Sequence, residues 1–495
     1  MEAVYRKFFR HYENNLDADA FDDLARVLDG EQWAAPEFGQ FAAHTLDAIA
    51  EVARLVVSKS PPALAMHEPT LYAGGAGIAL FLYHAWSRLK ALAVRDGVPT
   101  SLRPRLLADA DAYLAHAHAY ATQSVEALRR SHDRGTFHWE QVEAERGPSV
   151  FCGQAGIYLV AALVAHARQD HTGATTLLKE FVRLGSYLLC DDGDEPASGI
   201  CEDEVLYGQA GYLLGAVYLY RELGDDAAHP TITAILRYDF LKALIDQLIR
   251  RGVALAEQLT GRRRILLYQW HDHLYLGYAH GLMGILSALL ETLALPGMPA
   301  PTEEQAQLLR RTLEWVYTQH DGRGYYNSRV RLRPAVTSSS AAESNGRDTK
   351  RLVQWCHGSP GAVFLCSSAL CLDPDDARPR QEAVLAAEVV WREGLLRKGP
   401  GLCHGIGGNA YALLRCYVVA AGSDAERRLW LQRALAYAAF LTRYRGVDVA
   451  TPHWLFGPPG THIPDRPYSL YEGAAGFGCL LVDLLCPRHA HLPPC

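Results

Sequence analysis

Several features that would assign this chain to a common class at once are missing from it. Its 495 residues contain no uncharged apolar run of about 18 residues, so the sequence predicts no transmembrane helix. The net charge of −7 provides none of the basic surplus that nucleic-acid-binding chains carry. The alternation of β-branched and polar residues that marks half-buried strands is rare. These absences predict a helical protein that neither spans a membrane nor binds nucleic acid.

Targeting signals and disulfide patterns are also missing. The first residues form no apolar signal core, and position 2 is Glu2 rather than the glycine that N-myristoylation requires. The 11 cysteines follow no disulfide-like spacing. Together these features predict reduced thiols and a cytoplasmic protein, with nuclear or peripheral membrane association as the alternative. Most of the cysteines read as ordinary buried residues, namely Cys190, Cys366, Cys371, Cys416, Cys479 and Cys486.

Glycine, in contrast, recurs in a pattern. Seven G-x-x-G signatures stand directly before apolar runs, at irregular spacings typical of a repeat architecture. Two of them are preceded by Cys-His, which predicts soft metal ligands at equivalent places in adjacent repeats. The signatures occupy residues 74–77, 153–156, 208–211, 281–284, 358–361, 405–408 and 473–476.

Two kinds of helix are expected around these signatures. The segments that follow G-x-x-G are apolar all round, which predicts buried helices, whereas the intervening segments are amphipathic. We expect the first glycine to adopt a positive φ and the second to allow close backbone approach. Seven outer and inner helix pairs would close into an α/α barrel, with the loops before each signature around one cavity. The amphipathic segments are residues 106–128, 174–189, 303–317, 380–396 and 425–444.

The residues just before each first glycine would then ring the cavity. Cys356 and Cys403 stand one position earlier still, and thiolate together with imidazole is a donor set suited to zinc. Spacing alone does not distinguish His357, His404 and His280 as the imidazole ligand. The ring positions are Ala73, Cys152, Tyr207, His280, His357, His404 and Glu472.

The C-terminal half resembles a known family, the eukaryotic LanC-like proteins, which are related to the bacterial lanthionine cyclases. The resemblance rests on three segments, residues 355–361, 394–411 and 464–476, and on the order of all seven G-x-x-G units. The first segment reads Trp-Cys-His-Gly-Ser-Pro-Gly, and the second contains Leu-Cys-His-Gly-Ile-Gly-Gly. The resemblance extends over roughly residues 66–490.

This resemblance implies a fold and a metal. The fold is an all-α, (α/α) seven-fold barrel, and one zinc ion is held by Cys356, Cys403 and His404, with His357 a neighbour. It also implies that His280 and Glu204 act in proton transfer. The implied activity is the zinc-dependent addition of glutathione to dehydroalanine or dehydrobutyrine residues in proteins or peptides.

The resemblance further implies which residues contact glutathione. Lys398 matches a lysine that binds it, and Asp465 lies in the matching segment, where it would meet the glutathione amine. The family's usual arginine is His462 here, and Arg466 is close enough to substitute. Arg6, in the N-terminal segment, would close over the site.

Other functions remain open on the sequence. A glutathione-binding adaptor for a kinase or another signalling protein would need no open metal position with acids around it. A lanthionine-type peptide cyclase fits less well, because the segments around Cys403 and residues 464–473 look eukaryotic. A glycosidase would need paired carboxylates at the cavity mouth, where this chain has cysteine and histidine.

Two parts of the chain are expected, with one boundary between them. Residues 1–65 would form an N-terminal helical cap, and residues 66–495 the barrel. A disordered surface insertion is expected near residues 334–350, which are rich in serine and alanine. The acidic residues 191–203 read as a solvated loop, although Glu204 directly after them matches the family's acid.

Overall fold

The structure is a computed structural model that describes residues 11–133, 147–189, 202–224, 238–330, 351–419, 423–443 and 461–494, with the single residues 236, 332 and 458. The described chain is all-α, as the sequence predicts, and its described residues form isolated bridges but no strand. No helix among them is long and apolar enough to cross a membrane. The expected insertion at 334–350, the residue Arg6 and most of the acidic loop 191–203 lie outside the described residues.

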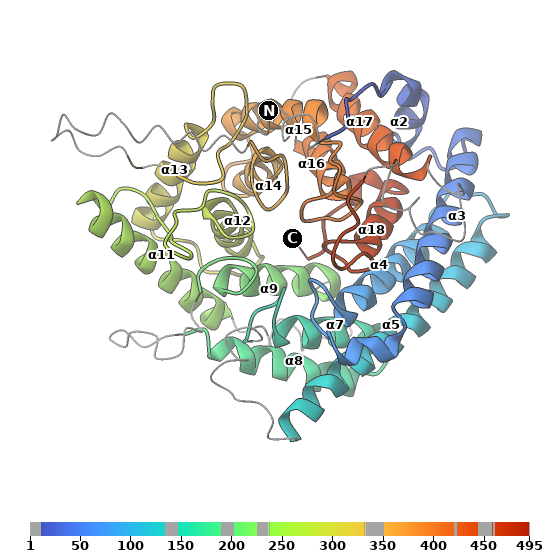
Figure 1. The fold of residues 1–495 in the computed structure, drawn as a ribbon, viewed down its shortest axis with the longest axis horizontal. Coiled ribbons are helices and arrows are strands. Elements are labelled where there is room, and N and C mark those ends of the chain that lie inside the picture. The colour runs from blue at the N-terminus through green and yellow to red at the C-terminus, as the bar shows by residue number, and fades with distance from the viewer. Residues whose placement is uncertain are drawn as a thin grey trace.

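The helices follow one another along the ring in Figure 1. Their bounds are α2 (Asp22–Asp29), α3 (Pro36–Lys59), α4 (Gly75–Ala93), α5 (Arg103–Asp133), α7 (Gln154–Ala167), α8 (His171–Ser186), α9 (Gln209–Leu223), α11 (Tyr238–Thr260), α12 (Leu282–Leu293), α13 (Glu303–Tyr317), α14 (Ser359–Ala369), α15 (Ala377–Glu393), α16 (Ile406–Val419), α17 (Asp424–Thr442) and α18 (Ala474–Leu484). The five predicted amphipathic segments correspond to α5, α8, α13, α15 and α17.

The helices that follow the G-x-x-G signatures form a closed inner ring. In sequence order, α4 contacts α7, and the contacts continue through α9, α12, α14, α16 and α18 until α18 contacts α4 again. Every residue of α12, α14 and α18 is buried. Burial of each large aliphatic side chain contributes about 1.5–3 kcal/mol, so these apolar runs supply much of the core.

The other helices lie outside this ring (Figure 1). All of them except α2, which contacts α3 and α17, pack against an inner helix. Six inner helices contact the outer helix that follows them in sequence, as α4 contacts α5 and α16 contacts α17. The seventh, α18, packs against α3 from the N-terminal segment. The segment expected as a cap therefore contributes an outer helix, while the proposed domain boundary at residue 65 stays a prediction.

The inner helices begin without a side-chain cap, because the preceding loop folds back over their first turn. Gly75 donates its amide to the carbonyl of Glu68, Gln154 to Gly147 and Ile406 to Gly399, all at 2.9–3.0 Å. Each donor follows the first glycine and reaches a carbonyl seven residues earlier. These bonds satisfy amide groups that a helix N-terminus otherwise leaves without a partner.

This fold-back explains the glycines and corrects one expectation. A Cβ on Gly408 would lie 1.8 Å from the Leu402 carbonyl oxygen, so no other residue fits there. Among the seven first glycines only Gly358 has a positive φ, of 105°. At Gly74 and Gly153, φ is near −120°, because the requirement is space for the loop carbonyl rather than a left-handed turn. The expectation of a positive φ at the first glycine was wrong.

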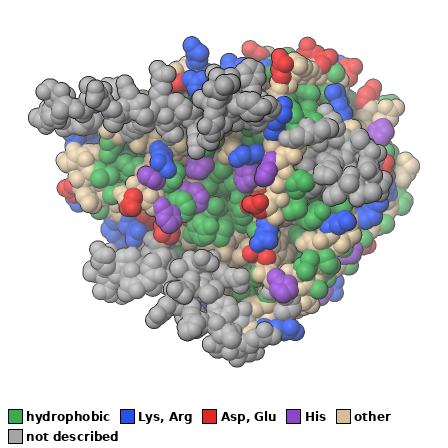
Figure 2. Space-filling model, in the orientation of Figure 1, with side chains coloured by type: hydrophobic (Ala, Val, Ile, Leu, Met, Phe, Trp, Pro, Cys, Tyr) green, Lys and Arg blue, Asp and Glu red, His purple; other side chains and the backbone are tan. Residues whose placement is uncertain are grey.

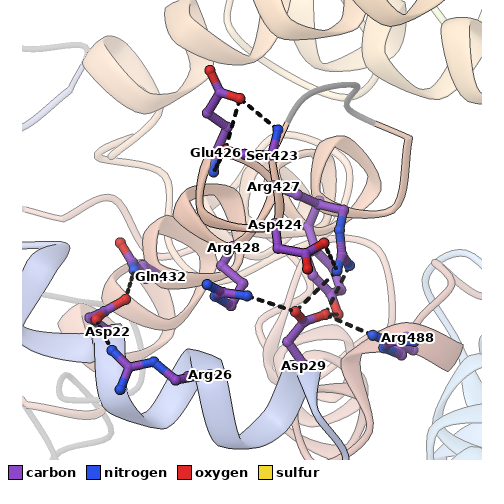
Figure 3. A network of polar contacts seen from close by, with 11 residues as sticks. Asp22, Arg26, Asp29, Ser423, Asp424, Glu426, Arg427, Arg428, Gln432 and Arg488 are labelled. Carbon is purple, nitrogen blue, oxygen red and sulfur yellow. Dashed lines mark hydrogen bonds and ion pairs between the residues drawn. The ribbon is translucent and has the colours of Figure 1, made fainter.

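A buried carboxylate joins the N-terminal helix α2 to the rest of the ring (Figure 3). Asp29 accepts hydrogen bonds from Arg427, Arg428 and Arg488, at 2.8–3.4 Å, and from Tyr417. Burial alone would raise the Asp29 pKa, but the hydrogen bonds from Tyr417 and Arg427 outweigh it and lower the pKa. Arg427 and Arg428 belong to α17 and Arg488 follows α18, so one side chain ties three segments together.

Candidate metal centre and adjoining acid site

A belt of backbone hydrogen bonds links the loops that precede the inner helices. Most of its members stand two positions before a first glycine, so the equivalent points of successive repeats are joined edge to edge. Residues that are neighbours in this belt are therefore side by side in space, although they are far apart in the chain. In order, each amide donates to the next carbonyl from Val205 to Ala279, Cys356, Cys403, Tyr471, Tyr72 and Phe151, at 2.8–3.4 Å.

Two cysteines are neighbours in this belt. The Cys356 amide donates to the Cys403 carbonyl at 3.3 Å, and His404 follows directly. The ligand atoms of Cys356, Cys403 and His404 lie within 4.8 Å of one another, and both cysteines are buried. In the described part of the chain this is the one group of three such side chains with the spacing of a metal site. His357, the open alternative from spacing, is not in the group.

The protonation of this group follows from its crowding. Hydrogen bonding to Cys356, burial and the Cys356 charge all raise the pKa of the Cys403 thiol, and His404 opposes them. Burial lowers the pKa of His404, but the hydrogen bond and charge of Cys403 outweigh it, so the net pKa is raised. Two thiolates cannot share this volume without a cation between them. The donor set, with two sulfurs and one imidazole, fits zinc.

Tyr72 is a site residue that the sequence reading missed. Burial raises its pKa, and a hydrogen bond to the Cys403 sulfur and the charge of Cys356 raise it further. Its ring stacks on Tyr471 at 5.0 Å between centroids. A signal was present, because Tyr72 stands two residues before Gly74, as Cys356 and Cys403 stand before their glycines.

The structure brings His280 and Glu204 together. Glu204 is buried, and its Oε2 lies 2.7 Å from His280 Nδ1. The same carboxylate accepts the backbone amides of Leu206, at 3.0 Å, and Tyr207. The carboxylate, itself held by two amides, fixes the orientation of the imidazole ring. Because an ionised carboxylate can only accept, the proton of this contact lies on Nδ1. The Nε2 atom is then the nitrogen available to exchange a proton.

Aromatic rings surround this imidazole. The Trp270 ring stacks on His280 with centroids 3.8 Å apart and planes 3° from parallel. Tyr207 is nearly parallel to both, at 6.2 Å from His280, and the His357 ring also lies 6.2 Å away. Figure 2 shows histidine side chains gathered near the middle of the face in view. Trp270 lies in a loop without any recurring signature, so sequence reasoning had no signal for it.

The residues expected to contact glutathione lie on exposed loops. Lys398, Asp465 and Arg466 are exposed, and the His462 amide donates to the Arg397 carbonyl at 2.9 Å, which joins the two loops. The charge of Lys398 opposes the raised pKa of His404, after the larger effects of burial and Cys403. Lys398 therefore lies near enough to His404 for its charge to act on the imidazole. The fourth expected contact, Arg6, is outside the described residues.

Cys152, another ring position, does not join the metal group. Burial raises its pKa, the Glu204 charge adds to this, and a hydrogen bond with Tyr207 opposes it. It is thus a neutral thiol that the Glu204 charge still influences. Glu472, the last ring position, accepts the backbone amide of Arg466 at 3.1 Å.

Comparison with known proteins agrees with this arrangement. The zebrafish (Danio rerio) protein named glutathione S-transferase LANCL1 is 29% identical over 425 residues, 86% of this chain and 84% of that protein. The Arabidopsis thaliana protein named LanC-like protein GCL1 is 30% identical over 353 residues, 70% of each. The family model described as lanthionine synthetase C-like protein matches residues 65–495. This chain therefore belongs to the lanthionine synthetase C-like family.

Proposed function

We propose that this protein is an enzyme that adds glutathione, through its sulfur, to dehydroalanine or dehydrobutyrine residues of proteins and peptides. The observation that carries the proposal is one belt of loops that holds both a Cys-Cys-His group and a carboxylate-oriented histidine. The relative named glutathione S-transferase supports glutathione as the co-substrate. We further propose that the closed cycle of inner helices is the seven-fold (α/α) barrel that the family resemblance implies.

Cys356, Cys403 and His404 are the proposed ligands of a single zinc ion. Three protein ligands leave a coordination position free, as catalytic zinc sites require. When bound there, zinc would hold the glutathione sulfur as a thiolate near neutral pH. Tyr72, hydrogen-bonded to the Cys403 sulfur, would orient that ligand and restrain its charge.

The proposed reaction forms one carbon–sulfur bond. The sulfur attacks the β-carbon of the dehydroamino acid, and the π electrons move onto the α-carbon and its carbonyl as an enolate. His280 delivers a proton from Nε2 to the α-carbon, while its Nδ1–H donates to Glu204 throughout. The proton lost by the glutathione thiol restores the imidazole, so no oxidant or reductant is needed.

Lys398, Asp465 and Arg466 are the proposed contacts of glutathione. Glutathione carries two carboxylates and one ammonium group, which suit two cations and one acid. Arg466 would take the place of the arginine that His462 replaces. Arg6 completes the proposed set from the N-terminal segment.

Mass spectrometry tests the proposal directly. A dehydroalanine peptide is incubated with glutathione and zinc-loaded protein, beside Cys403→Ala and, as a matched control, Cys371→Ala. Cys371 is exposed, so the expectation that it is buried was wrong. We expect a glutathione adduct with the wild type and Cys371→Ala only, together with about one zinc per chain in both. A zinc-loaded wild type that forms no adduct above the uncatalysed background would contradict the enzyme and favour an adaptor that only binds glutathione.

A further inference from the structure

One rim of the site carries a cation that the proposed reaction does not use. Arg329 is exposed, and its Nη2 donates to the Tyr275 hydroxyl at 3.3 Å, while its guanidinium carbon lies 5.2 Å from the Tyr275 ring centroid. Among the described residues no carboxylate pairs with Arg329. The guanidinium is thus held in place by a neutral group, and its charge is left for a ligand.

The backbone fixes this rim next to the acid site. The loop that carries Tyr275 pairs with the chain around Arg329, because Leu276 donates its amide to Ser328 and Val330 donates to Leu274, at 2.8–3.0 Å. Two antiparallel bonds on either side of the Tyr275 and Arg329 pair leave little freedom to either residue. The position of the guanidinium is therefore a property of the fold.

Tyr275 lies between this cation and the proposed acid. Its ring centroid is 6.2 Å from that of His280 and 5.6 Å from that of His357. The Trp270 ring, stacked on His280, is 5.8 Å from Tyr275. Aromatic and imidazole rings thus lie between the His280 imidazole and the Arg329 guanidinium. A flat, conjugated dehydroamino acid can stack on the faces of such rings.

We propose that this rim, formed by Trp270, Tyr275 and Arg329, binds the electrophilic peptide and selects one with an acidic residue near the dehydroamino acid. The inference rests on the proposed function, because His280 must reach the α-carbon. The Tyr275 ring centroid is 6.2 Å from that of His280 and 5.2 Å from the guanidinium carbon, so the imidazole and the guanidinium are at most about 11 Å apart. With the α-carbon at the imidazole, about three residues of extended peptide span that distance. An Asp or Glu side chain one to three positions away then meets Arg329.

The other charges nearby are consistent with this choice. Asp272 lies on the same loop, where its Oδ1 accepts a hydrogen bond from Gln269 at 3.2 Å, and it forms no ion pair with Arg329. Lys398 and Arg466, the proposed glutathione contacts, belong to the loops around His404. The two substrates would thus approach from different loops, glutathione beside the metal ligands and the peptide beside the acid.

Peptide competition tests the rim. Three dehydroalanine peptides that differ only in one flanking residue, Asp, Ala or Lys, are compared as substrates of the zinc-loaded protein with saturating glutathione. We expect kcat/KM for the Asp peptide to exceed that for the Lys peptide by about three- to tenfold, and the preference to shrink in high salt. Arg329→Gln should abolish the preference, and Arg323→Gln, an exposed arginine on a neighbouring turn, should keep it.

A binding measurement separates this inference from the proposed function. Labelled peptides with alanine in place of dehydroalanine cannot react, so anisotropy reports binding alone. A preference for the Asp peptide that Arg329→Gln removes would support the rim even if no adduct forms. Equal binding and turnover of the three peptides, or a higher KM for glutathione in Arg329→Gln with peptide preference unchanged, would overturn it.

Discussion

Glu204 Oε2 and His280 Nδ1 lie 2.7 Å apart although 76 positions separate the two residues in the chain. The carboxylate belongs to the loop before α9, and the imidazole to the loop before α12. Both loops are held by one belt bond, from the Val205 amide to the Ala279 carbonyl at 3.0 Å. The pair is therefore positioned by the backbones on either side of it, and the Glu204 carboxylate also holds its own loop through the amides of Leu206 and Tyr207.

Glu204→Gln should slow glutathione addition while zinc content stays at the wild-type level. The amide oxygen can still accept from Nδ1–H, but it carries no charge to stabilise a protonated His280, so we expect kcat to fall by about 10²-fold. Glu202→Gln removes a charge from the same loop and keeps the hydrogen bond to His280, so it should change kcat far less. Unchanged kinetics in Glu204→Gln, measured by adduct formation, would remove Glu204 from proton transfer.

Tyr72→Phe should weaken the metal site without dismantling it. The change deletes only the hydroxyl that bonds to the Cys403 sulfur, and losses of outer contacts of this kind cost about 10- to 100-fold in metal affinity or activity. Zinc competition against a chromophoric chelator measures the affinity. Tyr187→Phe, at an exposed tyrosine, serves as the control. Equal zinc affinities for all three proteins would show that Tyr72 does not support the ligand.

Gly408→Ala and Gly39→Ala should have opposite effects on stability. A Cβ at 408 meets the Leu402 carbonyl at 1.8 Å, so the loop that carries Cys403 must move, and we expect a loss of about 3 kcal/mol or more. A Cβ at 39 meets nothing within 4 Å in the first turn of α3, and alanine in place of glycine within a helix is favoured by up to about 0.5–1 kcal/mol. Chemical denaturation measures both. A tolerated Gly408→Ala would refute the close-approach account of the glycines.

Asp29→Asn should destabilise the protein at neutral pH and lose its effect in acid. The folded pKa of Asp29 is lowered, so its contribution is complete above the unfolded value of about 4 and is lost as the pH falls through the folded pKa. We expect a loss of about 2–3 kcal/mol at pH 7, because three arginines lose the negative charge and one of the two acceptor oxygens that they share.

The control for this prediction is Asp47→Asn, which removes an exposed ion pair with Arg105 and should cost less than about 1 kcal/mol. Urea titrations of the wild type and both variants, at pH 7 and at successive values below pH 4, provide the comparison. An effect of Asp29→Asn that persists unchanged in acid would mean that the ionised carboxylate is not its source.

The all-α class, the buried inner helices and the pairing of Cys356 with Cys403 could be predicted from the sequence pattern, because a recurring glycine signature marks equivalent positions. The choice of His404 over His357 and His280 came from the family resemblance. Glu204 and His280 came from resemblance, and their contact appears only in the structure. Arg329 and Trp270 gave no signal, since they lie in loops where neither periodicity nor a repeated motif constrains the residue. What joins them to the site is pairing between loops, which a single sequence does not display.

The glycines of the G-x-x-G signatures show a second limit of prediction from sequence. The signature was visible, yet its cause was misjudged, because a positive φ is the usual reason for a glycine at a turn. At Gly74 the angle is ordinary, and the obstruction is the Glu68 carbonyl, 2.0 Å from a would-be Cβ. Contacts between a residue and backbone six positions earlier depend on how the loop folds back, which local preferences do not specify.

The contacts of α18 with both α3 and α4 have a consequence for synthesis. A nascent chain exposes the apolar flanks of α3 and α4 until the last inner helix leaves the ribosome, since nothing earlier in sequence can cover them. Such a late, long-range closure is slow and leaves intermediates prone to aggregation. Molecular chaperones that shield apolar surface would therefore govern the yield of this protein, and stop codons before residue 474 would leave a ring that never closes.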